Sequence, residues 1–247
     1  MRQHFRLRST LLAGLVRVGL LPADGLLLYD STHVPWLSGF GSFAELCYAL
    51  VRCSVPEVVA EIGSAHGRST CYIAAGLQRN GKGQLYSIDP HTSTGWNDGD
   101  RDLDTFEAVR KRLRALRLDP WVTHLRMESR AACATWSFGK VDLLLVDGSH
   151  TQADVQADWT GFLPHLSPGA LVLFHDTMWE YRRDSPYWRE DQGVPRVVQA
   201  IQDAGYPAVT IMSGWGLTIV QNCRGGFPLL GGRDRSLTSP LHEPGES

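Results

Sequence analysis

Short apolar runs alternate with longer amphipathic stretches along most of this chain. Five of the runs cover residues 58–62, 84–88, 121–127, 141–146 and 170–174. The stretches between them have helical periodicity, which is typical of parallel strands joined by helices on both faces of one sheet. Two last runs, 208–212 and 217–221, enclose a tight turn at 213–216 and predict a closing antiparallel hairpin. We therefore expect a doubly wound α/β fold with a mostly parallel, seven-stranded sheet.

The stretches between the strands predict the helices and the domain limits. Ser42 and Glu45 form a capping box that opens a helix to about Cys53. Further helices are expected directly after the first strand, over 103–118, from Ser129, and over 153–166 and 194–204. The helix over 103–118 has a basic face, which either meets a phosphate or, more commonly, faces solvent. We place one domain at residues 42–222, after a leader at 1–41 and before an irregular tail at 223–247.

The leader begins with an arginine-rich segment, Met1–Leu21, that contains no acidic residue. Its apolar run is interrupted by Arg17 and no small-residue cleavage site follows, which argues against a signal peptide. We expect an amphipathic helix that docks on the domain as a leader or lid. Weak attachment to a membrane surface is the alternative.

Length and composition limit the class of protein. The 247 residues suffice for one large domain with a full core. The 24 basic and 26 acidic residues give a net charge of -2, so we expect a small-molecule or glycan substrate and no nucleic acid. Five cysteines without Cys-x-x-Cys spacing indicate reduced thiols in a cytoplasmic protein. No apolar run is long enough for stable membrane insertion. Assembly into a homo-oligomer is an open alternative to a monomer.

The chain is organised around the stretch Val58–Thr70, a buried strand that turns at a glycine into a helix. A dinucleotide site would have the spacing Gly-x-Gly-x-x-Gly, whereas here Glu61 precedes Gly63 and Gly67. An acidic residue on the strand suits a ligand with a positively charged end. S-adenosylmethionine (SAM) carries both an ammonium and a sulfonium. The alternative is an ordinary strand–helix turn of some other α/β protein.

Polar residues follow the other strands, at the edge where parallel sheets bind ligands. Asp89 ends the second strand, where a carboxylate can accept from both ribose hydroxyls of an adenosyl ligand. NAD enzymes share this feature, so it does not identify the cofactor. Ser129 follows the third strand and either touches the adenine or caps the helix that it begins.

Asp147 and Asp176 end neighbouring strands and suggest a cation site. Two carboxylates with water suit Mg²⁺. His175 is either a third ligand, which would favour Mn²⁺ or Fe²⁺, or it points into the core. A bound cation acidifies and orients an alcohol, and a nearby base then removes its proton. His150 is the candidate for that base; the alternative is that it only satisfies the turn.

Four segments together resemble the class I SAM-dependent O-methyltransferases. They are Glu61-Ile62-Gly63, Ser87-Ile88-Asp89-Pro90, Val146-Asp147-Gly148-Ser149-His150 and Phe174-His175-Asp176-Thr177. The most similar branch contains macrocin-type sugar methyltransferases and cephalosporin-hydroxylase-like proteins, over about residues 42–222. The resemblance implies the Rossmann-like fold of this class.

The resemblance also implies the site. In relatives such as catechol O-methyltransferase the corresponding positions hold Mg²⁺, which implies Asp147, His175 and Asp176 as metal ligands. His150 and Asp147 are then the catalytic residues. Lysine is the base in that enzyme and its strand-five pair is Asp-Asn, so this chain departs at both places. The residues expected to bind SAM are Glu61, Gly63, Ser64, His66, Ser69, Asp89, Ser129 and Asp147.

The implied activity is methyl transfer to a hydroxyl of a sugar or of a glycosylated or other natural-product small molecule. The aromatic segment Trp179–Trp188, with Trp96, is expected to cover the acceptor. Three alternatives remain: a nicotinamide-dependent oxidoreductase, a SAM-binding protein without transfer activity, and the same fold with metal-dependent hydrolytic or oxidative chemistry.

Overall fold

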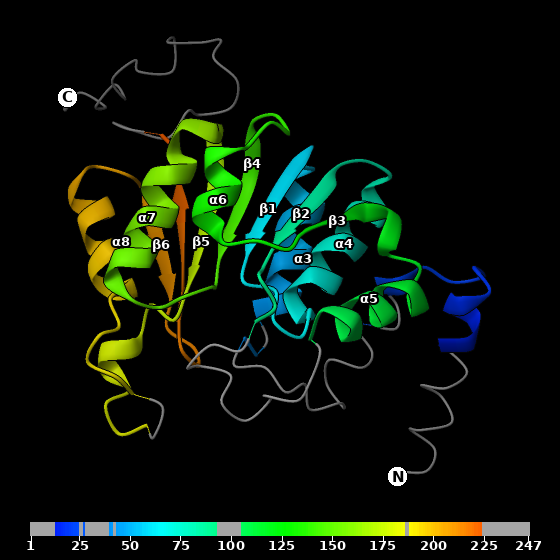
Figure 1. Cartoon of the computed structure of the whole chain (residues 1–247), viewed down its shortest axis with the longest axis horizontal. Helices are drawn as coiled ribbons and strands as arrows, with labels where there is room; N and C mark the ends of the chain where they lie inside the picture. Colours follow the sequence, from blue (N-terminus) through cyan, green and yellow to red (C-terminus); the bar gives the residue numbers. More distant parts are fainter. Residues whose placement is uncertain are drawn as a thin grey trace, which may run out of the picture.

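The computed structural model contains one seven-stranded sheet, as expected from the pattern of apolar runs. It describes residues 13–24, 27, 40–41, 43–92, 105–185 and 188–223. The strand order is β3-β2-β1-β4-β5-β7-β6 (Figure 1), and only the pairs of β7 with β5 and β6 are antiparallel. The strands are β1 Val58–Ile62, β2 Gln84–Ile88, β3 Val122–Leu125, β4 Val141–Val146, β5 Leu166–His175, β6 Ala208–Ile211 and β7 Leu217–Gln221.

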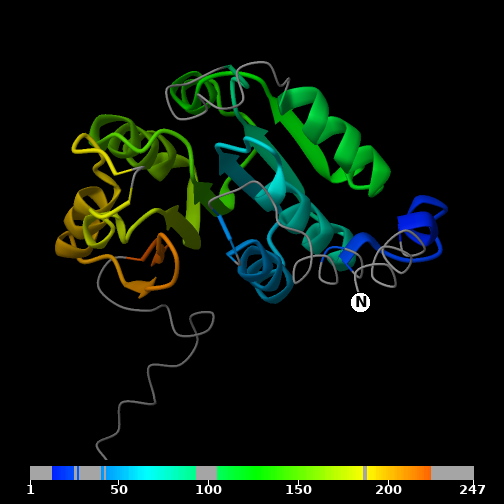
Figure 2. The same cartoon turned by 90° about the horizontal axis from the view of Figure 1, so that it is seen from below.

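Helices cover both faces of the sheet, in a three-layer arrangement visible end-on in Figure 2. Buried side chains of α3, α4 and α5 pack on one face, and those of α6, α7 and α8 on the other. The α-helices are α3 Phe43–Ser54, α4 Arg68–Asn80, α5 Thr105–Ala115, α6 Ser129–Ala134, α7 Gln152–Phe162 and α8 Val194–Asp203. Three 3₁₀ turns complete the described elements: η1 Asp119–Trp121, η2 Leu163–His165 and η3 Trp179–Tyr181.

The central strands are apolar on both faces because both faces are covered. Val59 of β1 packs with the α3–α4 layer, while Ala60 and Ile62 pack with the α7–α8 layer. This two-sided burial explains why β1 and β4 form nearly continuous apolar runs rather than alternating ones. Glu61 is the exception among these positions, and it belongs to the candidate site.

Several element limits differ from the expected ones. β5 begins at Leu166, not at residue 170, because Pro168 and Gly169 lie within the strand rather than in a turn before it. The register of β5 against β4 shifts between Val141 and Leu143, and Gly169 has a φ of +81° that suits such an irregularity. α7 ends at Phe162, because Pro164 has no N–H to continue the helix and the chain tightens into η2.

The described part of the leader packs on the domain. Residues 13–17 are helical, and Val16, Ala23 and Leu27 are buried in the same core cluster as α3 and α4. The expectations for Ser42, Trp96 and the tail beyond residue 223 fall outside the described residues. Across the described ranges, no helix is both long enough and apolar enough to cross a bilayer.

Candidate active site

Gly63 lets the ends of two central strands approach each other. It has a φ of +85°, and a Cβ at this position would lie 2.1 Å from the carbonyl oxygen of Asp147. Its N–H donates to the carbonyl of Ile88, and the N–H of Asp147 donates to the carbonyl of Ile62. The glycine therefore brings the turn after β1 against the start of the loop that carries Asp147.

Asp89 organises the glycine turn in this structure. Its Oδ2 accepts from the backbone N–H groups of Ser64 (2.9 Å) and Ala65 (2.8 Å), and its Oδ1 accepts from the N–H of His91 (2.7 Å). These three bonds hold the loops after β1 and β2 together at the carboxyl edge of the sheet. A role of Asp89 with a ribose stays a prediction, and the backbone contacts are ones that the sequence did not indicate.

Glu61 is fully buried beneath the turn. Its two carboxylate oxygens accept from the hydroxyls of Ser69 (2.5 Å) and Thr70 (2.7 Å), in the first turn of α4. Burial raises the pKa of Glu61 from 4.5 to about 7, although these hydroxyl bonds work in the opposite direction. Ser69, predicted as a cofactor contact, thus lies beside Glu61, and Thr70 is a partner that the prediction missed.

The raised pKa of Glu61 predicts a pH-dependent stability. Between pH 4.5 and about 7 the folded chain keeps a proton on Glu61 that the unfolded chain loses. The free energy of unfolding therefore falls as the pH rises through this window, by about 3 kcal/mol in all. Glu61→Gln removes this dependence. In scanning calorimetry, the melting temperature of the wild type minus that of the variant should therefore decrease between pH 5 and pH 8. A difference that stays constant over this range contradicts the burial of an ionisable Glu61.

Two other predicted cofactor residues make different contacts. Ser129 donates to Oδ1 of the buried Asp158 (2.5 Å), and the N-cap of α6 is Glu128, so the capping alternative for Ser129 is wrong. The prediction missed Asp158, whose pKa is raised by burial to about 6. The carbonyl of His66 accepts from Arg112 (2.8 Å), which ties the glycine turn to α5. Whether Ser129 or His66 touches a cofactor stays a prediction.

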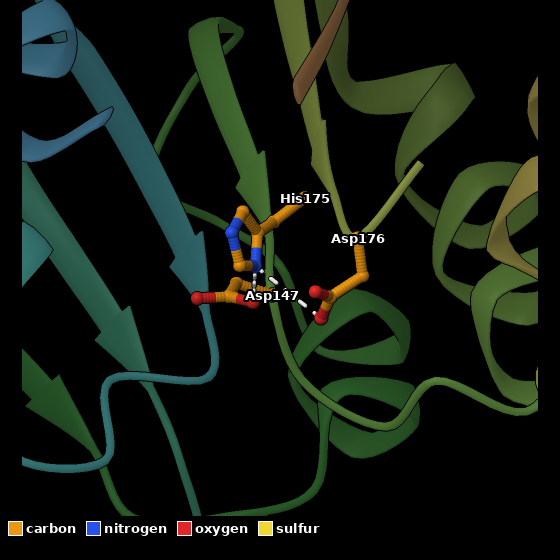
Figure 3. Close-up of side chains that lie close together, drawn as sticks. All are labelled: Asp147, His175 and Asp176. Carbon is orange, nitrogen blue, oxygen red and sulfur yellow. Dashed lines mark hydrogen bonds and ion pairs between the residues drawn. The ribbon is translucent and has the colours of Figure 1, made fainter. Parts of the chain in front are cut away.

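The ends of β4 and β5 bring four predicted residues together. His175 Nδ1 lies 2.9 Å from Asp147 Oδ1 and 3.3 Å from Asp176 Oδ2, as Figure 3 shows. His150 Nε2 lies 2.5 Å from the same oxygen of Asp176 and 3.9 Å from Asp147 Oδ1. Asp176 has a φ of 62°, a left-handed conformation that aspartate adopts more readily than most residues.

The two carboxylates and two imidazoles stabilise one another's charges. Burial by itself would lower the pKa of His175, but Asp147 and Asp176 outweigh it and raise the pKa to about 10. The pKa of His150 rises to about 9 in the same way, against burial, through Asp176 and Asp147. Burial would raise the pKa of Asp176, yet the two histidines hold it below its usual value.

The rings of Phe40 and Phe43 fix the orientation of His175. Their centroids lie 4.8 Å and 5.8 Å from the imidazole centroid. Within the described residues the buried Nε2 of His175 has no hydrogen-bond partner, whereas Nδ1 faces the two carboxylates. The ring is thus buried against apolar neighbours and directs one nitrogen into the cluster. Its role as a metal ligand stays a prediction. Nothing in the sequence marked these two phenylalanines.

The donor set of this cluster fits a divalent cation. Asp147, His175 and Asp176 each offer one ligand atom, and these atoms lie within 4.8 Å of one another. Two carboxylate oxygens are typical ligands of Mg²⁺, and an added imidazole nitrogen suits Mn²⁺ or Fe²⁺. A cation and the proton on His175 would compete for the same nitrogen, because an imidazole must be neutral to ligate.

Of the three described aromatic residues in the segment Trp179–Trp188, Trp179 is committed to packing. Trp179 is buried and stacks on Trp215 with centroids 4.7 Å apart, and the guanidinium of Arg182 lies 4.8 Å from the Trp215 ring. Trp188 is approached by Arg183, while Tyr181 is 75% exposed. Among the described aromatic residues of this segment, no stacked pair leaves a ring face free for an acceptor.

Comparison with known proteins shows which proteins this chain is similar to. Residues 60–177, just under half of the chain, match the family described as methyltransferase domain. This segment is similar to a methyltransferase domain. The matched segment begins in β1 and ends directly after Asp176, so it contains every predicted site residue. The expected seven-stranded α/β fold is confirmed, and the match supports the expectation of a methyltransferase.

Solved structures share the fold of this chain at low sequence identity. One is the O-methyltransferase TomG from Streptomyces achromogenes, involved in tomaymycin synthesis and solved with SAM. It is 20% identical with a TM-score of 0.57, over 78% of this chain and 85% of TomG. Another is an O-methyltransferase from Bacillus cereus in complex with SAH (S-adenosylhomocysteine), 16% identical with a TM-score of 0.58, over 85% and 96% of the two chains.

A third structure and one curated relative extend the comparison. The SAH-bound methyltransferase PaMTH1 of Podospora anserina is 15% identical with a TM-score of 0.56, over 80% of this chain and 86% of that one. The uncharacterized protein y4gI of Sinorhizobium fredii is 49% identical over 49 residues, which are 17% of this chain. The match spans only 5% of that relative's length.

Proposed function

We propose that this protein is a SAM-dependent O-methyltransferase that uses a divalent cation, with Mg²⁺ as the first candidate. Its acceptor is a hydroxyl of a sugar or of a glycosylated or other natural-product small molecule. The observation that carries this proposal is the cluster of Asp147, His150, His175 and Asp176, which adjoins the glycine turn after β1. SAM supplies a methyl group bound to a positively charged sulfur.

In this proposal, different residues at the glycine turn bind different parts of SAM. The methionine end lies near Glu61, Gly63 and Ser64, and the ribose near Asp89. All three of the similar solved structures described above hold SAM or SAH, which supports SAM over a nicotinamide cofactor. The match to a methyltransferase domain also favours transfer over the oxidoreductase and hydrolase alternatives.

The cluster at the ends of β4 and β5 prepares the acceptor. Asp147, His175 and Asp176 would hold the cation, which lowers the pKa of an alcohol and orients its oxygen when bound. If Asp147 and Asp176 held a cation, their charge would no longer keep the His150 imidazole protonated. Its Nε2 can then accept the hydroxyl proton. Catalysis comes mainly from holding two reactants in line.

Methyl transfer with and without a chelator tests this proposal. We expect label from methyl-labelled SAM to enter at least one of the methyl α-pyranosides of glucose, mannose and rhamnose. EDTA should lower the rate by at least about 100-fold, and added Mg²⁺ or Mn²⁺ should restore it, because the cation stabilises the developing oxyanion by several kcal/mol. Undiminished turnover in EDTA removes the cation from the scheme. SAH binding in calorimetry without transfer to any acceptor supports a SAM-binding protein instead.

Finer parts of the proposal rest on the resemblance described above. We place the protein in the branch with macrocin-type sugar methyltransferases and cephalosporin-hydroxylase-like proteins, and in the cytoplasm. All five cysteines are free, which supports a reducing compartment. Residues 1–41 would act as a leader or lid for the domain at 42–222.

A further inference from the structure

Unpartnered polar groups gather in the segment that connects β5 to α8. Gln192 is 1% exposed, and both Oε1 and Nε2 of its carboxamide are buried without a hydrogen-bond partner among the described residues. The hydroxyl of Thr177, which is 7% exposed, and the indole N–H of Trp188 are in the same state. Buried polar groups nearly always have partners, so three in one segment need a physical reason.

His150 connects the two ends of this segment. Its Nε2 contacts Asp176, which directly precedes Thr177. Its carbonyl accepts from the N–H of Gly193, which directly follows Gln192, and Thr151 forms a single β-bridge with Gln192. Thr177 and Gln192 are therefore each the sequence neighbour of a residue that contacts His150.

The unpartnered groups of this segment are all neutral. Of its arginines, Arg183 pairs with Glu180 (2.7 Å) and Arg189 with Asp191 (2.8 Å). Arg182 lies over the Trp215 ring and donates to the carbonyl of Gly214 (3.3 Å). A carboxamide offers one donor and one acceptor side by side, which matches hydroxyl groups, since a hydroxyl both donates and accepts. An anionic acceptor would instead call for an available cationic group.

We propose that Gln192 is a specificity-determining residue of the acceptor site, where its carboxamide hydrogen-bonds a hydroxyl next to the one that is methylated. The acceptor is then an uncharged polyhydroxy compound, with Thr177 as a second contact. This inference rests on the proposed methyltransferase function. It also explains why the carboxamide has no hydrogen-bond partner among the described residues: its donor and its acceptor would bind the hydroxyl of the acceptor molecule.

The stability of the ligand-free protein gives a first test that needs no acceptor. Gln192→Met keeps the length of the side chain and removes two unsatisfied buried polar atoms, so the melting temperature should rise by about 5 °C. Gln199→Met is the matched control, because Gln199 is exposed on α8 and its carboxamide donates to Asp203. The melting temperature of this variant should stay within about 1 °C of the wild type. A lower melting temperature for Gln192→Met shows that the amide supports the fold and overturns the proposal.

Kinetics with matched acceptors give the second test. The probes are the methyl α-pyranosides of glucose, mannose and rhamnose, each beside its monodeoxy counterparts. Gln192→Met should raise KM about tenfold for a methylated glycoside, with little change for the counterpart that lacks the neighbouring hydroxyl. Equal effects on both, or none, overturn the proposal, as does a wild type that binds SAH but methylates no glycoside. Absence of SAH binding in calorimetry marks failure of the methyltransferase function itself.

Discussion

Asp147→Asn should lower methyl transfer by about 10²–10⁴-fold while the protein stays folded. The substitution removes one of the two carboxylates of the proposed cation site. The amide oxygen can still accept from His175 Nδ1, which lies 2.9 Å from Asp147 Oδ1 in the wild type. The buried imidazole therefore keeps a partner, and the loss falls on cation binding and on the acidity of the acceptor hydroxyl. Transfer from methyl-labelled SAM to the glycosides above measures the rate, and calorimetry with Mn²⁺ measures the affinity for the cation.

Asp203→Asn is the control for this prediction. Asp203 is an exposed carboxylate at the end of α8 whose recorded bond is to Gln199, so its loss changes the charge of the chain equally without touching the cluster. Asp203→Asn should transfer methyl groups and bind SAH like the wild type. Transfer by Asp147→Asn at the wild-type rate, or equal losses in the two variants, would show that the cluster has another role.

The sheet was predictable because its strands are buried on both faces. β2, β4 and β7 begin and end at the residues expected, since turn residues bound each apolar run. The parallel order then brings Asp147, His150, His175 and Asp176 together, although 25 residues or more separate the two pairs along the chain. For these four residues, strand ends and topology were enough to predict proximity.

The contacts inside the loops were not predictable in the same way. Asp89 bonds backbone N–H groups, which carry no sequence signal because every residue except proline has one. Asp158 lies on the buried side of α7 beside Val155 and Trp159, so its place in the apolar stripe was a signal that went unused. Gln192 follows an irregular segment, and only the structure shows that both atoms of its amide are buried.

Gly63→Ala should unfold the protein or lower its melting temperature by more than about 10 °C. Two costs add at this position. The φ of +85° strains any residue with a Cβ, and that Cβ would lie 2.1 Å from the carbonyl oxygen and 2.5 Å from the carbonyl carbon of Asp147. Backbone atoms cannot move aside as a flexible side chain can, so the ends of β1 and β4 must separate. The separation displaces Asp147, and any folded variant should also lose affinity for Mn²⁺ in calorimetry.

Gly205→Ala isolates the first of these costs. Gly205 has a φ of +86°, and a Cβ there would meet nothing within 4 Å. This variant should lose only about 1 kcal/mol of stability, or a few degrees in melting temperature, and it should bind Mn²⁺ and SAH like the wild type. If the two variants melt within about 3 °C of each other, the strand ends are not in the close contact described here. Asp147 would then not be held against the glycine turn, and the proposed meeting of cofactor and acceptor would lose its structural basis.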